Sequence, residues 1–233
     1  MKRSEINKAL KDMENLINEH KFALPPFCHF TPEEWAEKGA EYDEVRDNML
    51  GWDITDYGLG DFEKLGFALI TLRNGNQNNP KYKKTYAEKL LMLKEGQHSP
   101  MHFHWNKSED IINRGGGTLI IHVYNDDGNG ELADTDFEVN SDGRTYNVPA
   151  GTGVELAPGE SITLWPHQYH DFDVKEGTGD VLIGEVSMCN DDNTDNRFHE
   201  EMGRFPTIEE DEAPYRFLCN EYNVSAEKQA RTK

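Results

Sequence analysis

The sequence contains few cysteines, few basic residues and no long apolar run, and each shortage excludes a class of protein. There are three cysteines, an odd number, and they lie far apart at Cys28, Cys189 and Cys219. They do not form the framework of a disulfide-rich secreted domain, so we expect reduced, buried thiols in a cytoplasmic protein. No stretch approaches the length of a transmembrane helix, and the charged N-terminus MKRSEINKALKDMENL lacks the apolar centre of a signal peptide.

Acidic residues outnumber basic ones by 44 to 24, which gives a net charge of −20. Binding of nucleic acid or of an anionic membrane requires concentrated lysine and arginine, so we expect neither partner. The charge fits a neutral or cationic small molecule better than a strongly phosphorylated one. Hydrophobic residues make up only 36% of the chain and the mean hydropathy is −0.82, but the aromatic content of 10% and the strand-like runs exclude a disordered chain.

The most informative stretch is residues 96–116, GQHSPMHFHWNKSEDIINRGG, in which two histidines and a carboxylate lie between glycines. His102 and His104 are two residues apart, a spacing that points both rings to one face of a strand but about 200° apart on a helix. Glu109 can reach the same face only if the chain bends, and the polar residues 106–108 can supply that bend. Two imidazoles and a carboxylate are a ligand set for a divalent transition metal.

The first 50 residues predict helices. An apolar stripe at helical spacing predicts a helix over about 4–20, in which Ser4 can serve as the N-cap. Thr31-Pro32-Glu33-Glu34 is a capping box with proline at the first helical position, so a second helix is expected to begin there. A further turn or helix is expected around 42–49.

From residue 51 onward, short apolar runs alternate with turns rich in glycine, asparagine and proline. They predict strands at 67–72, 86–93, 118–124, 135–139, 144–148, 152–156, 161–165, 170–174 and 180–187. Many short strands at this spacing are typical of an all-β barrel or sandwich. We therefore expect an N-terminal helical extension over residues 1–50, a β-barrel with the metal site over 51–222, and a C-terminal tail over 223–233.

The glycines, histidines and glutamate of residues 96–116 resemble the first motif of the cupin superfamily, and Gly159–Pro166 resembles the second. The second match departs from the pattern in its spacing and lacks the glycine after the proline. The resemblance implies a small antiparallel β-barrel, or jelly roll, with the metal inside and the N-terminal helices packed outside. It leaves His167 and His170 as alternatives for a fourth ligand. We favour His170, because a bulky apolar residue two positions after the ligand recurs in cupins and Phe172 fits.

Three neutral imidazoles and one carboxylate leave open positions on an octahedral ion, where substrate oxygens can enter. Mn²⁺ or Fe²⁺ suits this mixed set of nitrogen and oxygen ligands, and Co²⁺, Ni²⁺ or Zn²⁺ could substitute. The ligand set alone does not choose between an oxygenase, an isomerase and a passive sugar sensor.

Longer segments resemble one family of cupins, the D-lyxose isomerases. These segments are residues 102–117, 184–198 and 203–206, together with the proline-rich Leu24–Phe27. The resemblance extends from residue 4 to about residue 222. It implies a Mn²⁺-dependent aldose–ketose isomerase that interconverts D-lyxose and D-xylulose, and usually D-mannose and D-fructose, and that forms a homodimer.

Isomerisation moves hydrogen between C1 and C2 of the sugar, and the sequence offers the groups for this step. A metal on the C1 and C2 oxygens would stabilise enediolate charge while a carboxylate carries the proton. We expect Glu185, on a predicted strand next to Gly184, to be the base, with Glu109 as the alternative if it leaves the metal. Lys89 is expected to point into the barrel as a proton donor or hydroxyl clamp.

Four further residues are expected to contact the sugar: Lys107, Asp191, Asp192 and Arg204. A hydride shift between C1 and C2 would need no base, and this alternative stays open. Two other functions also stay open. An Fe²⁺ cupin dioxygenase would favour a largely apolar pocket, and a non-enzymatic sugar-binding cupin would need no base.

Overall fold

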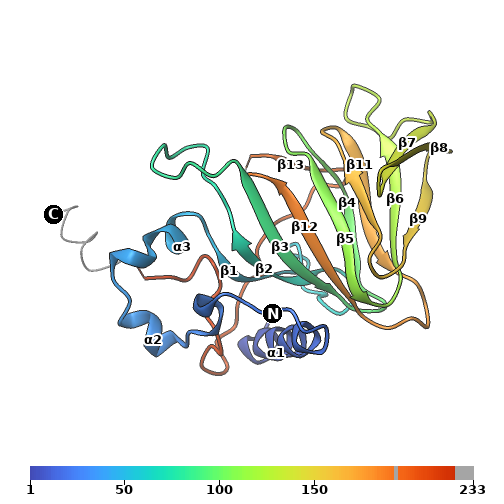
Figure 1. Ribbon diagram of the computed structural model, residues 1–233. Helices are drawn as coiled ribbons and strands as arrows, with labels where there is room; N and C mark the ends of the chain where they lie inside the picture. The colour runs from blue at the N-terminus through green and yellow to red at the C-terminus, as the bar shows by residue number, and fades with distance from the viewer. Residues whose placement is uncertain (192–193, 224–233) are drawn as a thin grey trace.

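A computed structural model describes residues 1–191 and 194–223, in which N-terminal helices lie outside a barrel of two antiparallel β-sheets (Figure 1). The helices are α1 (Arg3–Glu19), α2 (Pro32–Ala36) and α3 (Asp43–Asp47), with 3₁₀ turns η1 (Pro26–His29) and η2 (Ala40–Tyr42). The strands are β1 (Gly51–Thr55), β2 (Phe67–Arg73), β3 (Tyr86–Leu93), β4 (His98–His104), β5 (Glu109–Gly116), β6 (Leu119–Asn125), β7 (Phe137–Ser141), β8 (Arg144–Val148), β9 (Thr152–Leu156), β10 (Ser161–Leu164), β11 (Gln168–Val174), β12 (Val181–Met188) and β13 (Asn196–Phe198).

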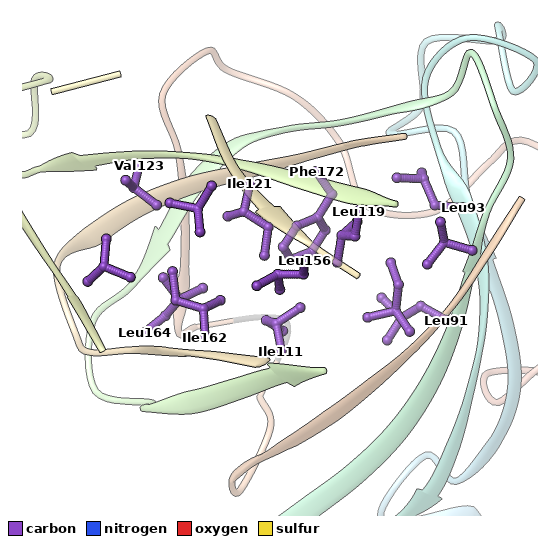
Figure 2. Packing of buried hydrophobic residues seen from close by; sticks show 14 of the residues in the cluster. Leu91, Leu93, Ile111, Leu119, Ile121, Val123, Leu156, Ile162, Leu164 and Phe172 are labelled. Atoms are coloured by element: carbon purple, nitrogen blue, oxygen red, sulfur yellow. The ribbon is translucent and has the colours of Figure 1, made fainter. Parts of the chain in front are cut away.

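The strands form a large and a small sheet that enclose one apolar core. The large sheet has the order β1-β2-β3-β12-β5-β10-β7-β8, and the small sheet has the order β13-β4-β11-β6-β9. Alternate side chains of each strand point inward, as Leu119, Ile121 and Val123 do on β6. Figure 2 shows these side chains meeting Leu91, Ile111 and other residues of the large sheet between the two sheets. The expected mainly-β cupin barrel, with helices outside, is confirmed.

Helix α1 packs on the outer face of the large sheet. Its apolar stripe is fully buried and contacts β1, β2 and β3 in a second apolar cluster; the stripe consists of Ile6, Leu10, Met13 and Ile17. The expected cap was wrong, because the helix begins earlier, at Arg3, with Lys2 as the N-cap. The hydroxyl of Ser4 instead donates to Asp211 at 2.7 Å, which ties α1 to the C-terminal segment. The predicted capping box of α2 is present, with Thr31 and Glu34 bonded reciprocally.

The C-terminal segment returns to the N-terminal helices. Arg3 is buried and pairs with Glu210 and Glu221, and the backbone N–H of Cys219 donates to the carbonyl of Trp52 at 2.7 Å. Both ends of the described chain therefore pack on the same side of the barrel. The three-part division at residues 50 and 222 remains a proposal, and residues 224–233 of the expected tail lie outside the described residues.

All three cysteines are buried free thiols. In the part of the chain that the structure describes, no helix has both the length and the apolar character needed to cross a membrane.

Candidate functional site

Three histidines on neighbouring strands of the small sheet meet inside the barrel. His102 and His104 lie on β4, and His170 lies opposite His102 in the register of β4 with β11. One ligand nitrogen of each ring lies within 4.8 Å of the others. His167 lies elsewhere: it is half-exposed, and its Nδ1 is 3.3 Å from Asp126. The structure thus brings His170, and not His167, to the predicted pair.

Glu109 reaches these histidines from the large sheet. Strand β4 belongs to the small sheet and β5 to the large one, so the bend over residues 105–108 carries the chain between the sheets. Glu109 is the first residue of β5 and is buried. Its Oε1 lies 3.2 Å from Nε2 of His104 and 3.1 Å from Nε2 of His170. Three imidazoles and one carboxylate oxygen therefore converge; the spacing predicted the shared face of His102 and His104, and the cupin resemblance indicated His170.

The convergent atoms have the chemistry of a metal site. Nδ1 of His102 lies 2.8 Å from the carbonyl of Pro100, and Nδ1 of His170 lies 3.0 Å from the carbonyl of Gln168. A proton on each Nδ1 satisfies these carbonyls and leaves Nε2 with a free lone pair. Nε2 of His170 is buried and makes no hydrogen bond, although Oε1 of Glu109 lies 3.1 Å away. A cation between the rings would satisfy it.

Electrostatics favour the protonation states of His102 and Glu109 that a cation requires. Burial lowers the pKa of His102 well below its ordinary value, and repulsion from His170 and His104 lowers it further. Burial opposes the charge on Glu109, but attraction to Lys107 and His104 outweighs burial and holds the pKa of this carboxyl well below its usual range. Near neutral pH the site therefore offers neutral imidazole and an ionised carboxylate, the forms that bind metals.

A buried charge network lies directly beside the four residues. Nζ of Lys107 lies 2.8 Å from Oε2 of Glu109 and 2.8 Å from Oε1 of Glu185, so it links the two carboxylates. Glu185 on β12 is the register partner of Lys89 on β3, and their charged atoms are 3.2 Å apart. All four side chains are less than 10% exposed, as the values of 3%, 2%, 7% and 8% for Lys107, Glu109, Glu185 and Lys89 show.

Lys107 and Lys89 stabilise the ionised form of Glu185. Burial alone would raise the pKa of this carboxyl, but attraction to Lys107 and Lys89 outweighs burial and lowers it. Burial opposes the charge of Lys107 in turn, and its two carboxylate partners raise its pKa above the ordinary value. Glu185 is therefore a carboxylate and Lys107 an ammonium ion near neutral pH, which suits proton transfer next to a cationic group.

These groups line one common cavity. Most of the lining residues are polar or charged, and Phe67, Leu69, Leu91, Phe172 and Phe198 supply an apolar wall. The polar lining residues that the sequence did not single out are Thr55, Tyr57, Ser99, Asn190 and Asn196. This mixture of hydroxyl, amide and charged groups matches the many hydroxyls of a sugar.

The remaining predicted contact residues are distributed unevenly. Arg204 lines the cavity and is paired with Asp53. Asp191 lines a neighbouring cavity instead, where it lies within 3.4 Å of Nδ2 of Asn78. Asp192 lies outside the described residues. Asn190 was missed as a site residue, although its Oδ1 accepts a 2.7 Å hydrogen bond from Nζ of Lys89 and it lies within the family-like segment 184–198.

Asp195 fixes the bend that places Lys107. Its carboxylate accepts hydrogen bonds from the backbone N–H groups of Asn106 at 2.9 Å and Lys107 at 3.1 Å. Its carbonyl accepts a third bond from the N–H of Trp105 at 3.0 Å. This residue is buried, and it supplies the partners that an irregular buried backbone requires.

Replacing Asp195 by alanine is expected to loosen this bend. The N–H groups of Asn106 and Lys107 would lose their partner, and an unsatisfied buried donor costs about 1–3 kcal/mol. A displacement of Lys107 by about 1 Å would lower kcat/KM by up to about 100-fold. Thermal unfolding and sugar turnover measure both effects, with the exposed Asp136→Ala as the control. Unchanged turnover in Asp195→Ala would show that the bend does not position the cavity.

Comparison with known proteins gives matches over nearly the whole chain. The profile of the D-lyxose isomerase family matches residues 1–222. A protein of Serratia proteamaculans named D-lyxose/D-mannose isomerase is 48% identical over 223 residues, which cover 95% of this chain and 98% of that protein. A protein of Escherichia coli O157:H7 with the same name is 47% identical over the same shares.

Solved structures agree in fold. The L-ribose isomerase of Acinetobacter sp. DL28 in complex with L-ribose has a TM-score of 0.58 at 11% identity, covering 89% of this chain and 98% of that chain. The Cellulomonas parahominis L-ribose isomerase with L-ribose has a TM-score of 0.55 at 14% identity, covering 97% of both chains. Such distant likenesses concern the fold, whereas the sequence matches concern the family. On these matches, the chain belongs to the D-lyxose isomerase family, and it is a cupin-fold isomerase that acts on a small sugar.

Proposed function

We propose that this protein is a metal-dependent aldose–ketose isomerase that interconverts D-lyxose and D-xylulose, and also D-mannose and D-fructose. The observation that carries the proposal is the position of Glu185. This buried carboxylate lies in the same cavity as the histidine cluster and is linked to it through Lys107. The names of the relatives support the choice of sugars.

The proposed ligands of one divalent cation are His102, His104, Glu109 and His170. Bound there, the ion would act as a Lewis acid toward the C1 and C2 oxygens of the sugar. The mixed nitrogen and oxygen set favours Mn²⁺, with Fe²⁺, Co²⁺, Ni²⁺ or Zn²⁺ as substitutes. The buried, unpartnered Nε2 of His170 supports this assignment.

We assign proton transfer at carbon to Glu185. Its carboxylate takes the proton from C2 of the aldose, the C–H electron pair becomes the C1–C2 double bond of an enediolate, and the same carboxyl returns the proton to C1. Lys89 supplies a proton to the C1 oxygen and receives the one that leaves the C2 oxygen, so no external oxidant or reductant is needed. The charge of Lys107 stabilises the developing oxyanion, and Arg204 is assigned to a distal hydroxyl.

Asp191 and Asp192 were expected to contact the sugar as well. Because Asp191 lines the neighbouring cavity, we assign it to the approach to the site and not to the reacting end of the sugar. The charged and amide-rich lining differs from the largely apolar pocket expected of a cupin dioxygenase.

The experiment that tests the proposal is sugar turnover after metal removal and Mn²⁺ add-back, with D-lyxose, D-mannose and D-xylose in parallel. The expected result is Mn²⁺-dependent formation of D-xylulose from D-lyxose and of D-fructose from D-mannose. No ketose from any sugar, in protein that still binds the ion, would refute the isomerase. Oxygen uptake on Fe²⁺ loading would then favour the dioxygenase.

We also propose that the protein is a cytoplasmic homodimer. The family resemblance supports the dimer, and the three buried free thiols support a reducing compartment. The chain has a mass of 26.7 kDa, so sedimentation velocity should give about twice that value. A single species of the monomer mass at micromolar concentration would contradict the dimer.

A further inference from the structure

A second cluster of ligand-type side chains lies on the outer face of the small sheet. It consists of His98 on β4 and of Asp171 and Asp173 on β11, and one ligand atom of each lies within 4.8 Å of the others. Nδ1 of His98 is 3.0 Å from Oδ1 of Asp173. None of these residues lines the sugar cavity.

The pleat of β11 places this cluster behind the first one. Successive side chains of a strand alternate between its faces. His170 and Phe172 contact the interior of the barrel, so Asp171 and Asp173 point outward. Strict alternation along β4 would place His98 on the inner face with His102, but the pairing of β4 with β11 shifts its register between His170 and Phe172, so that His98 lies opposite Asp173 on the outer face. The strands β4 and β11 therefore carry inner and outer ligand sets on opposite faces.

His122 on the neighbouring strand β6 fixes the orientation of Asp171. Its Nδ1 lies 2.8 Å from Oδ1 of Asp171, and its backbone N–H donates to the same oxygen at 3.1 Å. The same Nδ1 is 3.6 Å from Oδ2 of Asp173. Carboxylates that ligate a metal are generally hydrogen-bonded by an outer group, and His122 supplies such a bond to Asp171.

We propose that His98, Asp171 and Asp173 bind a second divalent transition cation, with His122 as the positioning residue for Asp171. Ligand atoms about 2.1 Å from an ion lie about 3.0 Å apart at adjacent octahedral positions, the separation of His98 from Asp173. Two carboxylates neutralise the charge of the ion. One imidazole with two carboxylates suits Zn²⁺, Co²⁺ or Mn²⁺.

Because the cluster lies on the outer face of the sheet, an ion can reach it from solvent and can have a structural role. The side chains of His98 and Asp173 are 34% and 35% exposed, so an ion can enter from solvent and keep water on its open positions. Bound there, it joins β4 to β11, the two strands that carry the inner histidines. The ion therefore stiffens the wall of the barrel and takes no part in the chemistry.

Equilibrium dialysis against Zn²⁺ tests this proposal, because it counts ions without reference to catalysis. Wild-type protein should bind two equivalents. The double variant His102→Ala/His104→Ala should keep the outer equivalent, and Asp173→Asn or His98→Ala should keep the inner one. His29→Ala, which removes an isolated histidine–carboxylate pair, should leave both.

A second readout follows folding stability. In the His102→Ala/His104→Ala background, Zn²⁺ at 100 times its dissociation constant should raise Tm by about 5 °C or more, and Asp173→Asn should abolish the shift. The second site would be refuted if wild-type protein bound only one equivalent of Zn²⁺ and the His102→Ala/His104→Ala variant bound none. It would also be refuted if the Asp173→Asn and His98→Ala variants each still bound two equivalents of Zn²⁺. A failure of sugar turnover with the outer equivalent intact would instead refute only the isomerase proposal.

Discussion

Replacing His170 by alanine is expected to remove the divalent ion and with it sugar turnover, whereas replacing His167 by alanine should leave both. His170 is buried within 4.8 Å of the ligand atoms of His102 and His104, and its Nε2 has no hydrogen-bond partner to lose. His167 is half-exposed and contacts Asp126. Outer supports of a metal site contribute about 10–100-fold in affinity, so loss of a direct ligand should cost more than about 100-fold.

Metal content after dialysis and turnover at saturating Mn²⁺ measure the two effects in parallel. Thermal unfolding of both variants checks that the barrel remains folded, since His170→Ala also leaves a small cavity in the wall. If excess Mn²⁺ restores turnover in His170→Ala, this histidine tunes affinity and is not required for chemistry. If His167→Ala loses the ion and His170→Ala keeps it, the assignment of the fourth ligand is wrong.

The histidine pair could be predicted because the two residues are close together in the sequence. His102 and His104 share a face on any strand, and that inference required no knowledge of the neighbouring strands. Strands with continuous apolar or β-branched runs were predicted for the same reason, and β3 was placed at its observed bounds, Tyr86–Leu93. The motif resemblance supplied the rest, since the distance from β4 to β11 cannot be read from spacing.

The missed elements are those in which local propensity is weak. Strand β5 carries Glu109, Asp110 and Asn113, and β1 is only five residues long and begins at Gly51, whose φ is positive. Both are strands because neighbouring strands pair with them: β5 lies between β12 and β10, and β1 lies at the edge beside β2. Tertiary pairing thus overrides composition at these positions.

The charge network was predicted residue by residue but not as a network. Lys107 is 78 positions from Glu185 along the chain, and the sequence offers no signal that they lie 2.8 Å apart. Asp195 and Asn190 were missed for the same reason. Each acts through a hydrogen bond to a residue far away in the sequence. Asp195 accepts from the backbone of Lys107, and Asn190 accepts from the side chain of Lys89.

Replacing Glu185 by glutamine is expected to lower kcat by about 10²–10⁴-fold with little change in the affinity for sugar. Glutamine keeps the shape and a hydrogen-bonding oxygen for Lys107, so the cavity should remain formed. It cannot accept the C2 proton, however, and this loss affects only the chemical step. Steady-state kinetics of D-lyxose conversion and calorimetric binding of a non-reacting polyol separate the two quantities.

Glu155→Gln is the matched control, because Glu155 is a half-exposed strand carboxylate paired with Lys175 on the barrel surface. Deuterium at C2 of D-lyxose adds a second measurement. Proton transfer through Glu185 permits exchange with water, so part of the label should be lost, whereas a hydride shift would carry all of it to C1. Full retention of the label together with undiminished turnover in Glu185→Gln would assign the reaction to a hydride shift. The buried Lys107–Glu185 pair would then serve to hold the sugar and orient Glu109, and the lowered pKa of Glu185 would reflect that structural role alone.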